Sequence, residues 1–191
     1  MATHDFQHRS LQVELAAAYD KIGDIQGGRY ANHLGQRQKA REGYRKALKI
    51  REALLSAEPA NVSVRRQGVV SEILIKTGRA AESIELLKKS LLTLQESFAH
   101  SPTDKIAHFR IGVVQAGLGK GYAALASDEK SSATKSLANW RAARSWFQKS
   151  QEIHKSFFDA GDLIGDDAAR YELVNNGIKT CDAAIARLTG K

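Results

Sequence analysis

Few side chains in this sequence have the types and spacing that catalysis or metal binding requires. His4 and His8 stand four residues apart, which would place two metal ligands on one side of a helix, but no third ligand follows nearby. The single cysteine, Cys181, falls on an apolar helical stripe rather than at a helix start, so we expect a buried structural thiol. Segment 159–167, DAGDLIGDD, lacks the alternating oxygen ligands and closing glutamate of a calcium loop. We therefore expect no catalytic, cofactor or metal site, and no enzyme activity.

The composition predicts an all-helical chain. It has two prolines and no sustained alternation of Val, Ile and Thr, whereas Ala, Leu, Lys, Arg, Glu and Gln are abundant. At 191 residues the chain is long enough to bury a core as one domain. No apolar run approaches the roughly 20 residues that span a membrane, and MATHDFQHRS lacks the features of a signal peptide. We therefore expect no membrane insertion and a cytoplasmic location. The net charge of +8 disfavours basic partners and permits acidic ones.

An internal repeat organises the chain. Segment 35–48, GQRQKAREGYRKAL, has the same skeleton as segment 78–91, GRAAESIELLKKSL. In both copies a glycine is followed by a small residue, a bulky apolar residue and a second small residue, at steps of five, four and three. A third copy keeps the last three positions without the nearby glycine. Small residues at this spacing let a second helix approach closely, and the bulky residue fills the gap between the helices. The nine positions are Ala40, Tyr44, Ala47, Ser83, Leu87, Ser90, Ala143, Phe147 and Ser150.

This pattern resembles the tetratricopeptide repeat, in which a first helix with Leu-Gly and Tyr precedes a second with Ala and Phe, closed by Pro. Here Leu15-Ala16, Tyr19 and Gly23 precede the first unit, and Pro59 and Pro102 close the first two. In both units the closing proline stands 19 residues after the first small repeat residue, which is Ala40 or Ser83. This spacing lengthens each second helix by about two turns. The resemblance implies an all-α, right-handed solenoid of about three extended helical hairpins plus a C-terminal capping helix. In a single domain, 1–191, the units would span about 5–59, 60–102 and 103–160, and the capping helix about 166–189.

Apolar spacing also predicts where individual helices run. Long helices are expected at about 5–23, 37–57 and 137–158, the first with an apolar stripe of Leu11, Leu15, Ala18 and Ile22. Glycine-rich segment 24–37 and polar segment 127–136 interrupt the pattern as insertions. The first insertion is either a binding loop or a tolerated surface insertion. Trp140 and Trp146 are expected to pack between helices rather than to bind a ligand.

A closer resemblance rests on longer stretches. AAAYDKIGDIQG, YRKALKIREAL, LGKGYAALA, ARSWFQKSQEIHKSF and CDAAIARL are similar to the C-terminal tetratricopeptide regions of bacterial serine/threonine protein kinases, of the kind common in acidobacteria. The kinase motifs themselves are absent from this sequence, as is the membrane segment that often joins the two parts. The chain is then either a region excised from such a kinase, whose location would be unknown, or a stand-alone relative.

The resemblance implies a function in protein binding. First-helix surfaces of stacked tetratricopeptide units form a concave groove that holds a peptide or a helix of a partner, here with a sensor or docking role in a kinase system. Phe109 and Arg110 are the expected anchors, because aromatics and arginines most often anchor interfaces. The competing interpretation is that Phe109 packs internally and Arg110 is only solvated. The implied groove residues are Arg65, Val69, Glu72, Lys76, Ile106, Phe109, Arg110 and Val113.

A basic ridge supports a different function. Basic residues recur every four positions along one predicted helix, at Arg37, Arg41, Arg45 and Lys49. Like charges at this spacing disfavour the helix slightly unless an acidic ligand meets them. The alternative function is therefore a module that binds nucleic acid or another anionic surface, although nucleic acid is disfavoured because no aromatic stacking platform accompanies the ridge. A solvated outer face and self-association through the long helices are further alternatives.

Overall fold

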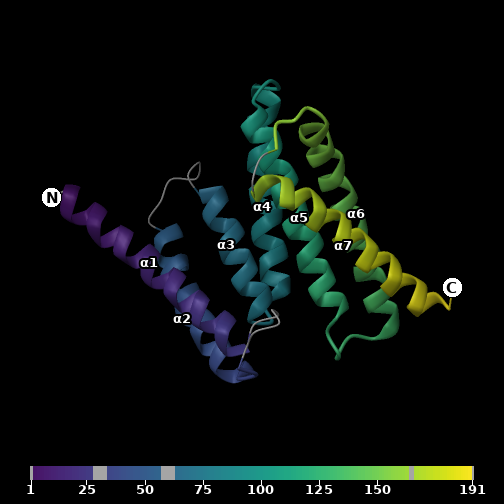
Figure 1. The fold of residues 1–191 in the computed structure, drawn as a ribbon, viewed down its shortest axis with the longest axis horizontal. Coiled ribbons are helices and arrows are strands. Elements are labelled where there is room, and N and C mark those ends of the chain that lie inside the picture. The colour runs from purple at the N-terminus through teal and green to yellow at the C-terminus, as the bar shows by residue number, and fades with distance from the viewer. Residues whose placement is uncertain (1, 28–33, 57–62, 164–165, 191) are drawn as a thin grey trace. The chain divides into compact units, whose positions relative to one another are not determined.

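The computed structural model describes residues 2–27, 34–56, 63–163 and 166–190, which form helices and no strand (Figure 1). This confirms the all-helical class. The chain divides into two compact units, Met1–Arg79 with the first three helices and Ala80–Lys191 with the other four. The helices are α1 (Ala2–Gly27), α2 (Arg37–Ser56), α3 (Ser63–Lys76), α4 (Ala80–His100), α5 (Lys105–Ala126), α6 (Ala133–Asp159) and α7 (Asp166–Thr189).

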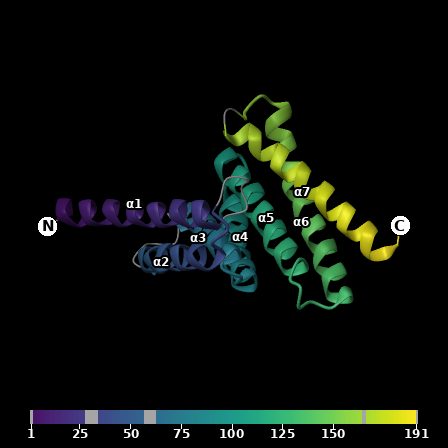
Figure 2. The same cartoon turned by 60° about the horizontal axis from the view of Figure 1, so that its bottom comes forward.

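In the first unit, α1 and α2 form an antiparallel hairpin and α3 packs on α2 (Figure 2). The two long helices approach closely where glycines face them. A Cβ atom on Gly23 would lie 2.6 Å from the Tyr44 ring, and one on Gly43 would lie 3.1 Å from the backbone oxygen of Tyr19. The first-helix glycine and the bulky repeat residue are therefore paired in space, as the repeat predicts.

The apolar stripe predicted for the first helix is not the face that packs in this hairpin. Leu11, Leu15, Ala18 and Ile22 are all exposed, while Ala16 and Gly23 are buried. Close approach explains the outcome, because the backbone of α2 fits against a small residue and a glycine better than against branched side chains. The helix also runs to Gly27, so the predicted insertion at 24–37 begins inside α1; residues 28–33 lie outside the described structure.

In the second unit, successive helices pack on one another from α4 to α7. All nine repeat positions, in both units, are buried, as expected of residues that pack between helices. The apolar residues along one side of α4 are buried from Ile84 to Leu94, and Phe98, one turn further on, is half-buried. Trp140 and Cys181 lie in the same core cluster as Phe147.

Glycines again receive the bulky repeat residues. A Cβ on Gly117 would lie 2.9 Å from Leu87, which joins α4 to α5. Phe147 of α6 lies between two glycines, because a Cβ would come within 2.7 Å of its ring at Gly119 of α5 and within 2.9 Å at Gly177 of α7. The aromatic ring of Phe147 is therefore packed closely against both α5 and α7, and it joins three helices.

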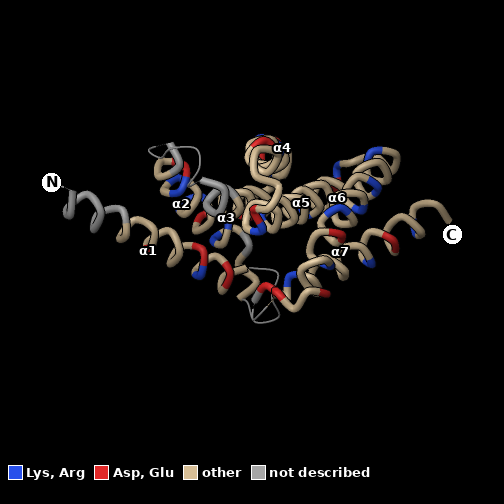
Figure 3. Tube along the Cα trace, turned by 90° about the horizontal axis from the view of Figure 1, so that it is seen from above, with Lys and Arg blue, Asp and Glu red and all other residues tan. Residues whose placement is uncertain are grey.

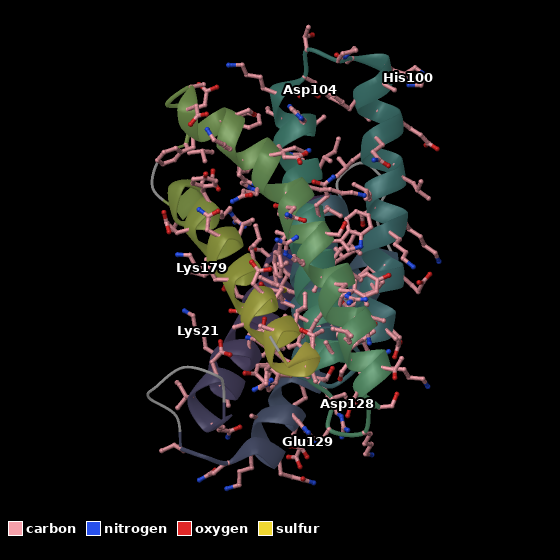
Figure 4. The ribbon with its side chains drawn as sticks, turned by 90° about the vertical axis from the view of Figure 1, so that its right-hand side faces the viewer. Lys21, His100, Asp104, Asp128, Glu129 and Lys179 are labelled. Carbon is pink, nitrogen blue, oxygen red and sulfur yellow. The ribbon has the colours of Figure 1, made fainter. Side chains whose placement is uncertain are left out.

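The helix ends follow local chemistry. Asp104 caps α5, since its Oδ1 accepts hydrogen bonds from the backbone of Ile106 and Ala107, both at 2.9 Å (Figure 4). Ser132 caps α6, which therefore begins earlier than predicted and takes up the end of the 127–136 insertion. Asp166 and Asp167 lie in the first turn of α7.

Backbone conformation explains why each of the first two repeat copies begins with glycine. Gly35 and Gly78 both have positive φ, 71° and 83°, a region that other residues rarely adopt. At the end of α3 the backbone N–H of Arg79 donates to the carbonyl of Leu74, as in a glycine-terminated helix. The shared glycine thus ends one segment and redirects the chain into the second helix.

Candidate interaction surface

The predicted groove residues of the first unit lie on α3. Glu72 and Lys76 are exposed and Val69 is half-buried, whereas the side chain of Arg65 lies outside the described structure. Lys76 is engaged within its own unit, because its Nζ donates to Asp24 Oδ1 at 2.7 Å. A partner would therefore meet Lys76 already paired with a carboxylate, which reduces the positive charge it offers.

The predicted groove residues of the second unit share one face of α5. Ile106 is 64% exposed and Arg110 is also exposed, one turn further along, while Val113 is half-buried. Phe109 is half-buried and packs edge-on against His154 and Phe157 of α6, with ring centroids 5.2 and 5.4 Å apart. Phe109 thus takes part in packing within its unit, and the exposed part of this face is Ile106 and Arg110.

A polar cluster that sequence reasoning missed joins the three helices of the first unit. Asp24 Oδ1 accepts hydrogen bonds from Tyr44 Oη at 2.6 Å and from Lys76 Nζ at 2.7 Å. The ammonium also lies 4.8 Å from the centre of the Tyr44 ring. Burial alone would raise the pKa of Asp24, but the bonds from Lys76 and Tyr44 outweigh it and hold that pKa below its usual value. No motif spacing could reveal this cluster, since its members are 20 and 52 residues apart.

One turn away, Asp20 forms an ion pair with Arg51 at 2.6 Å. Burial raises the pKa of Asp20 above its usual value, although the guanidinium opposes this effect. Asp20 Oδ1 and Arg51 Nε are buried without a hydrogen-bond partner among the described residues. Both atoms are closed off from solvent, so the pair serves to join α1 to α2 rather than to bind a ligand.

The basic ridge has no acidic partner within the described part of the chain. Arg41, Arg45 and Lys49 are exposed, and no described residue forms an ion pair with them. Figure 3 marks Lys and Arg positions on α2 in blue. The side chain of Arg37 lies outside the described structure. Glu52 of the same helix forms an ion pair with Arg79, with its Oε1 3.7 Å from Arg79 Nη1. The ridge is therefore a solvated cationic face that an anion could approach.

A Ser–His pair in the second unit has the spacing of a catalytic pair, but it is buried and no substrate can reach it. Ser150 Oγ lies 3.1 Å from His154 Nδ1 and donates to the backbone carbonyl of Gly112 at 2.8 Å. His154 is 1% exposed, and burial holds its pKa below the usual value. No substrate can reach a hydroxyl in this position, so the pair bonds α6 to α5. The i, i+4 spacing of Ser150 and His154 was the sequence signal for it.

Other candidate chemistry is also structural. Cys181 is fully buried, as predicted, and burial raises its pKa to about 11. Trp140 is buried as predicted, and Trp146 is half-buried with Lys149 Nζ 4.5 Å from its ring centre. Within the described part of the chain no cluster of His, Cys, Asp or Glu could hold a metal ion. No described helix is long and apolar enough to cross a membrane.

Comparisons of the chain with protein-family models, with curated proteins and with solved structures found no match.

Proposed function

We propose that this chain is a non-enzymatic protein-interaction module, a right-handed tetratricopeptide-like solenoid that binds a peptide or a helix of a partner protein along its first-helix surfaces. The burial of all nine repeat positions supports this proposal most directly. A helical array of this kind has a rigid framework whose exposed helix faces are free to vary, which suits it to binding extended partners. The similarity to kinase-linked regions suggests docking in a serine/threonine kinase system.

The α5 face is the best candidate for the contact. Ile106 and Arg110 lie one helical turn apart and are both exposed, so an apolar and a cationic side chain stand next to each other. Arginine beside an apolar anchor is a common centre of protein interfaces. An acidic partner suits this face, since the guanidinium can pair with a carboxylate and the chain carries a net charge of +8.

A pull-down from the source organism followed by variant binding tests this function. Ile106→Ala and Arg110→Ala should each weaken binding of the captured partner about tenfold at unchanged helicity. Phe109→Ala is a poorer probe, because it also removes the contact with His154 and Phe157. The matched control is Arg45→Ala, which removes the same charge from the α2 ridge and should leave binding intact. If partner binding is unchanged by both α5 variants, the assignment of this face is refuted.

The ridge supports a second candidate function, binding of an anionic polymer or surface. Its favouring observation is that Arg41, Arg45 and Lys49 have no acidic partner among the described residues. Phosphate binding would weaken steeply as salt rises, whereas apolar contacts on α5 would not. Replacing Arg41 and Arg45 with Glu should abolish binding to heparin or DNA if this function holds. Binding to such polymers that survives the reversal would exclude it.

A further inference from the structure

The exposed stripe of α1 has the spacing of a coiled-coil seam. Five apolar residues follow one another at alternating steps of four and three, at Leu11, Leu15, Ala18, Ile22 and Ile25. This is the heptad pattern that two helices use to pack along each other. The four large members are 65%, 46%, 44% and 57% exposed, so most of the seam's apolar surface faces solvent.

The seam is separate from the face that builds the hairpin. Ala16 and Gly23 of the same helix are buried towards α2. At 3.6 residues per turn the centre of the seam lies roughly 130° around the helix from this buried face. α1 therefore has two apolar faces, of which the hairpin covers one.

We propose that the seam packs against the same seam of a second copy of this chain, in antiparallel orientation. The charges beside the seam select this arrangement. Glu14 and Lys21 lie on the same flank, both exposed, and are seven residues apart. In an antiparallel pair this flank runs along its own counterpart, which brings Glu14 of each copy beside Lys21 of the other. The side chain of Lys21 projects from α1 in Figure 4.

The antiparallel arrangement also matches the sizes of the side chains that meet along the seam. Antiparallel pairing centred between Leu15 and Ala18 sets a large residue opposite a small one, and it sets Leu11 opposite Ile22. A parallel pair would instead place Glu14 opposite Tyr19 and Lys21 opposite Gln26, which brings no opposite charges together. Charge and side-chain size therefore both favour the antiparallel dimer.

The expected dimer is weak. The seam spans about two heptads, so it buries less than the roughly 800 Å² per partner of a standard interface. A dissociation constant on the order of 10–100 μM is expected. Sedimentation equilibrium of the full chain over that concentration range measures it directly. Leu15→Glu should weaken dimerisation at least about tenfold, since it buries a charge against Ala18 of the other copy.

A charge exchange tests the orientation. Glu14→Lys and Lys21→Glu should each weaken self-association roughly 3- to 10-fold, because both flanking pairs become repulsive. A mixture of these two variants should recover wild-type affinity, since each copy then faces its opposite charge. Glu42→Lys and Lys39→Glu make the same charge changes on α2 and should leave self-association unchanged. Circular dichroism verifies that every variant keeps its helical content.

Three results would overturn the proposal. A wild-type chain that stays monomeric throughout the range would exclude the second copy as the occupant. A dimer that is insensitive to Leu15→Glu would lie elsewhere on the molecule. A mixture of the two charge variants that keeps its helical content but associates no better than either variant alone would exclude the antiparallel seam.

Discussion

Gly119→Ala is expected to destabilise the second unit although alanine favours helices. A Cβ atom at this position would lie 2.7 Å from Cδ1 of Phe147, closer than such atoms normally approach. Phe147 is 5% exposed, and an added Cβ at Gly177 would lie 2.9 Å from Cζ of the same ring, so a second helix also restricts its movement. Overpacking of this kind costs about 1–3 kcal/mol.

The magnitude follows from two opposing effects. Replacing a glycine inside a helix by alanine contributes about 1 kcal/mol of stability when nothing obstructs the new methyl group. Against the overpacking cost this leaves a net loss of about 1 kcal/mol for Gly119→Ala. Gly68→Ala is the matched control, because no atom of the described residues lies within 4 Å of the added Cβ in α3. It should gain up to about 1 kcal/mol.

Urea denaturation followed by circular dichroism and by tryptophan fluorescence measures both changes. Both tryptophans lie in α6, so their fluorescence reports on the second unit. In a Phe147→Leu background the smaller side chain frees the space, and Gly119→Ala should then become stabilising, with a coupling free energy of about 2 kcal/mol. A stabilised Gly119→Ala in the wild-type background would refute the sandwiched arrangement of Phe147.

Three further predictions concern the core and the buried groups. Because burial lowers the pKa of His154 in the folded chain, the free energy of unfolding should be highest above pH 6.5 and fall as the pH drops below it, and His154→Gln should flatten that dependence in urea titrations from pH 7.5 to 5. Cys181, with its pKa raised to about 11, should react with a thiol reagent such as dithionitrobenzoate only in denaturant, so rapid labelling of the native chain at pH 8 would contradict its burial. Ala47→Trp should lower stability by about 1–3 kcal/mol because Ala47 is fully buried, while the same change at exposed Lys39 should not; equal melting temperatures would argue against the repeat assignment.

The sequence by itself determined the helical class and the nine buried repeat positions. These features depend on local chemistry. Helical periodicity aligns Ala40, Tyr44 and Ala47 on one side of α2 whatever that side meets. A pattern of neighbouring residues is enough to predict such features.

Only the tertiary structure decided which of two apolar faces α1 buries. Periodicity marked Leu11 and Leu15 as strongly as any face, but the close approach of α2 favoured the face with Ala16 and Gly23. Tertiary contacts also decided which of the predicted site residues are exposed or unpaired. Whether Phe109 is exposed depends on His154, 45 positions later, and whether Lys76 is unpaired depends on Asp24, 52 positions earlier. Contacts between distant segments leave no periodic trace in the chain, because each side chain's spacing is set by its own helix and not by its partner.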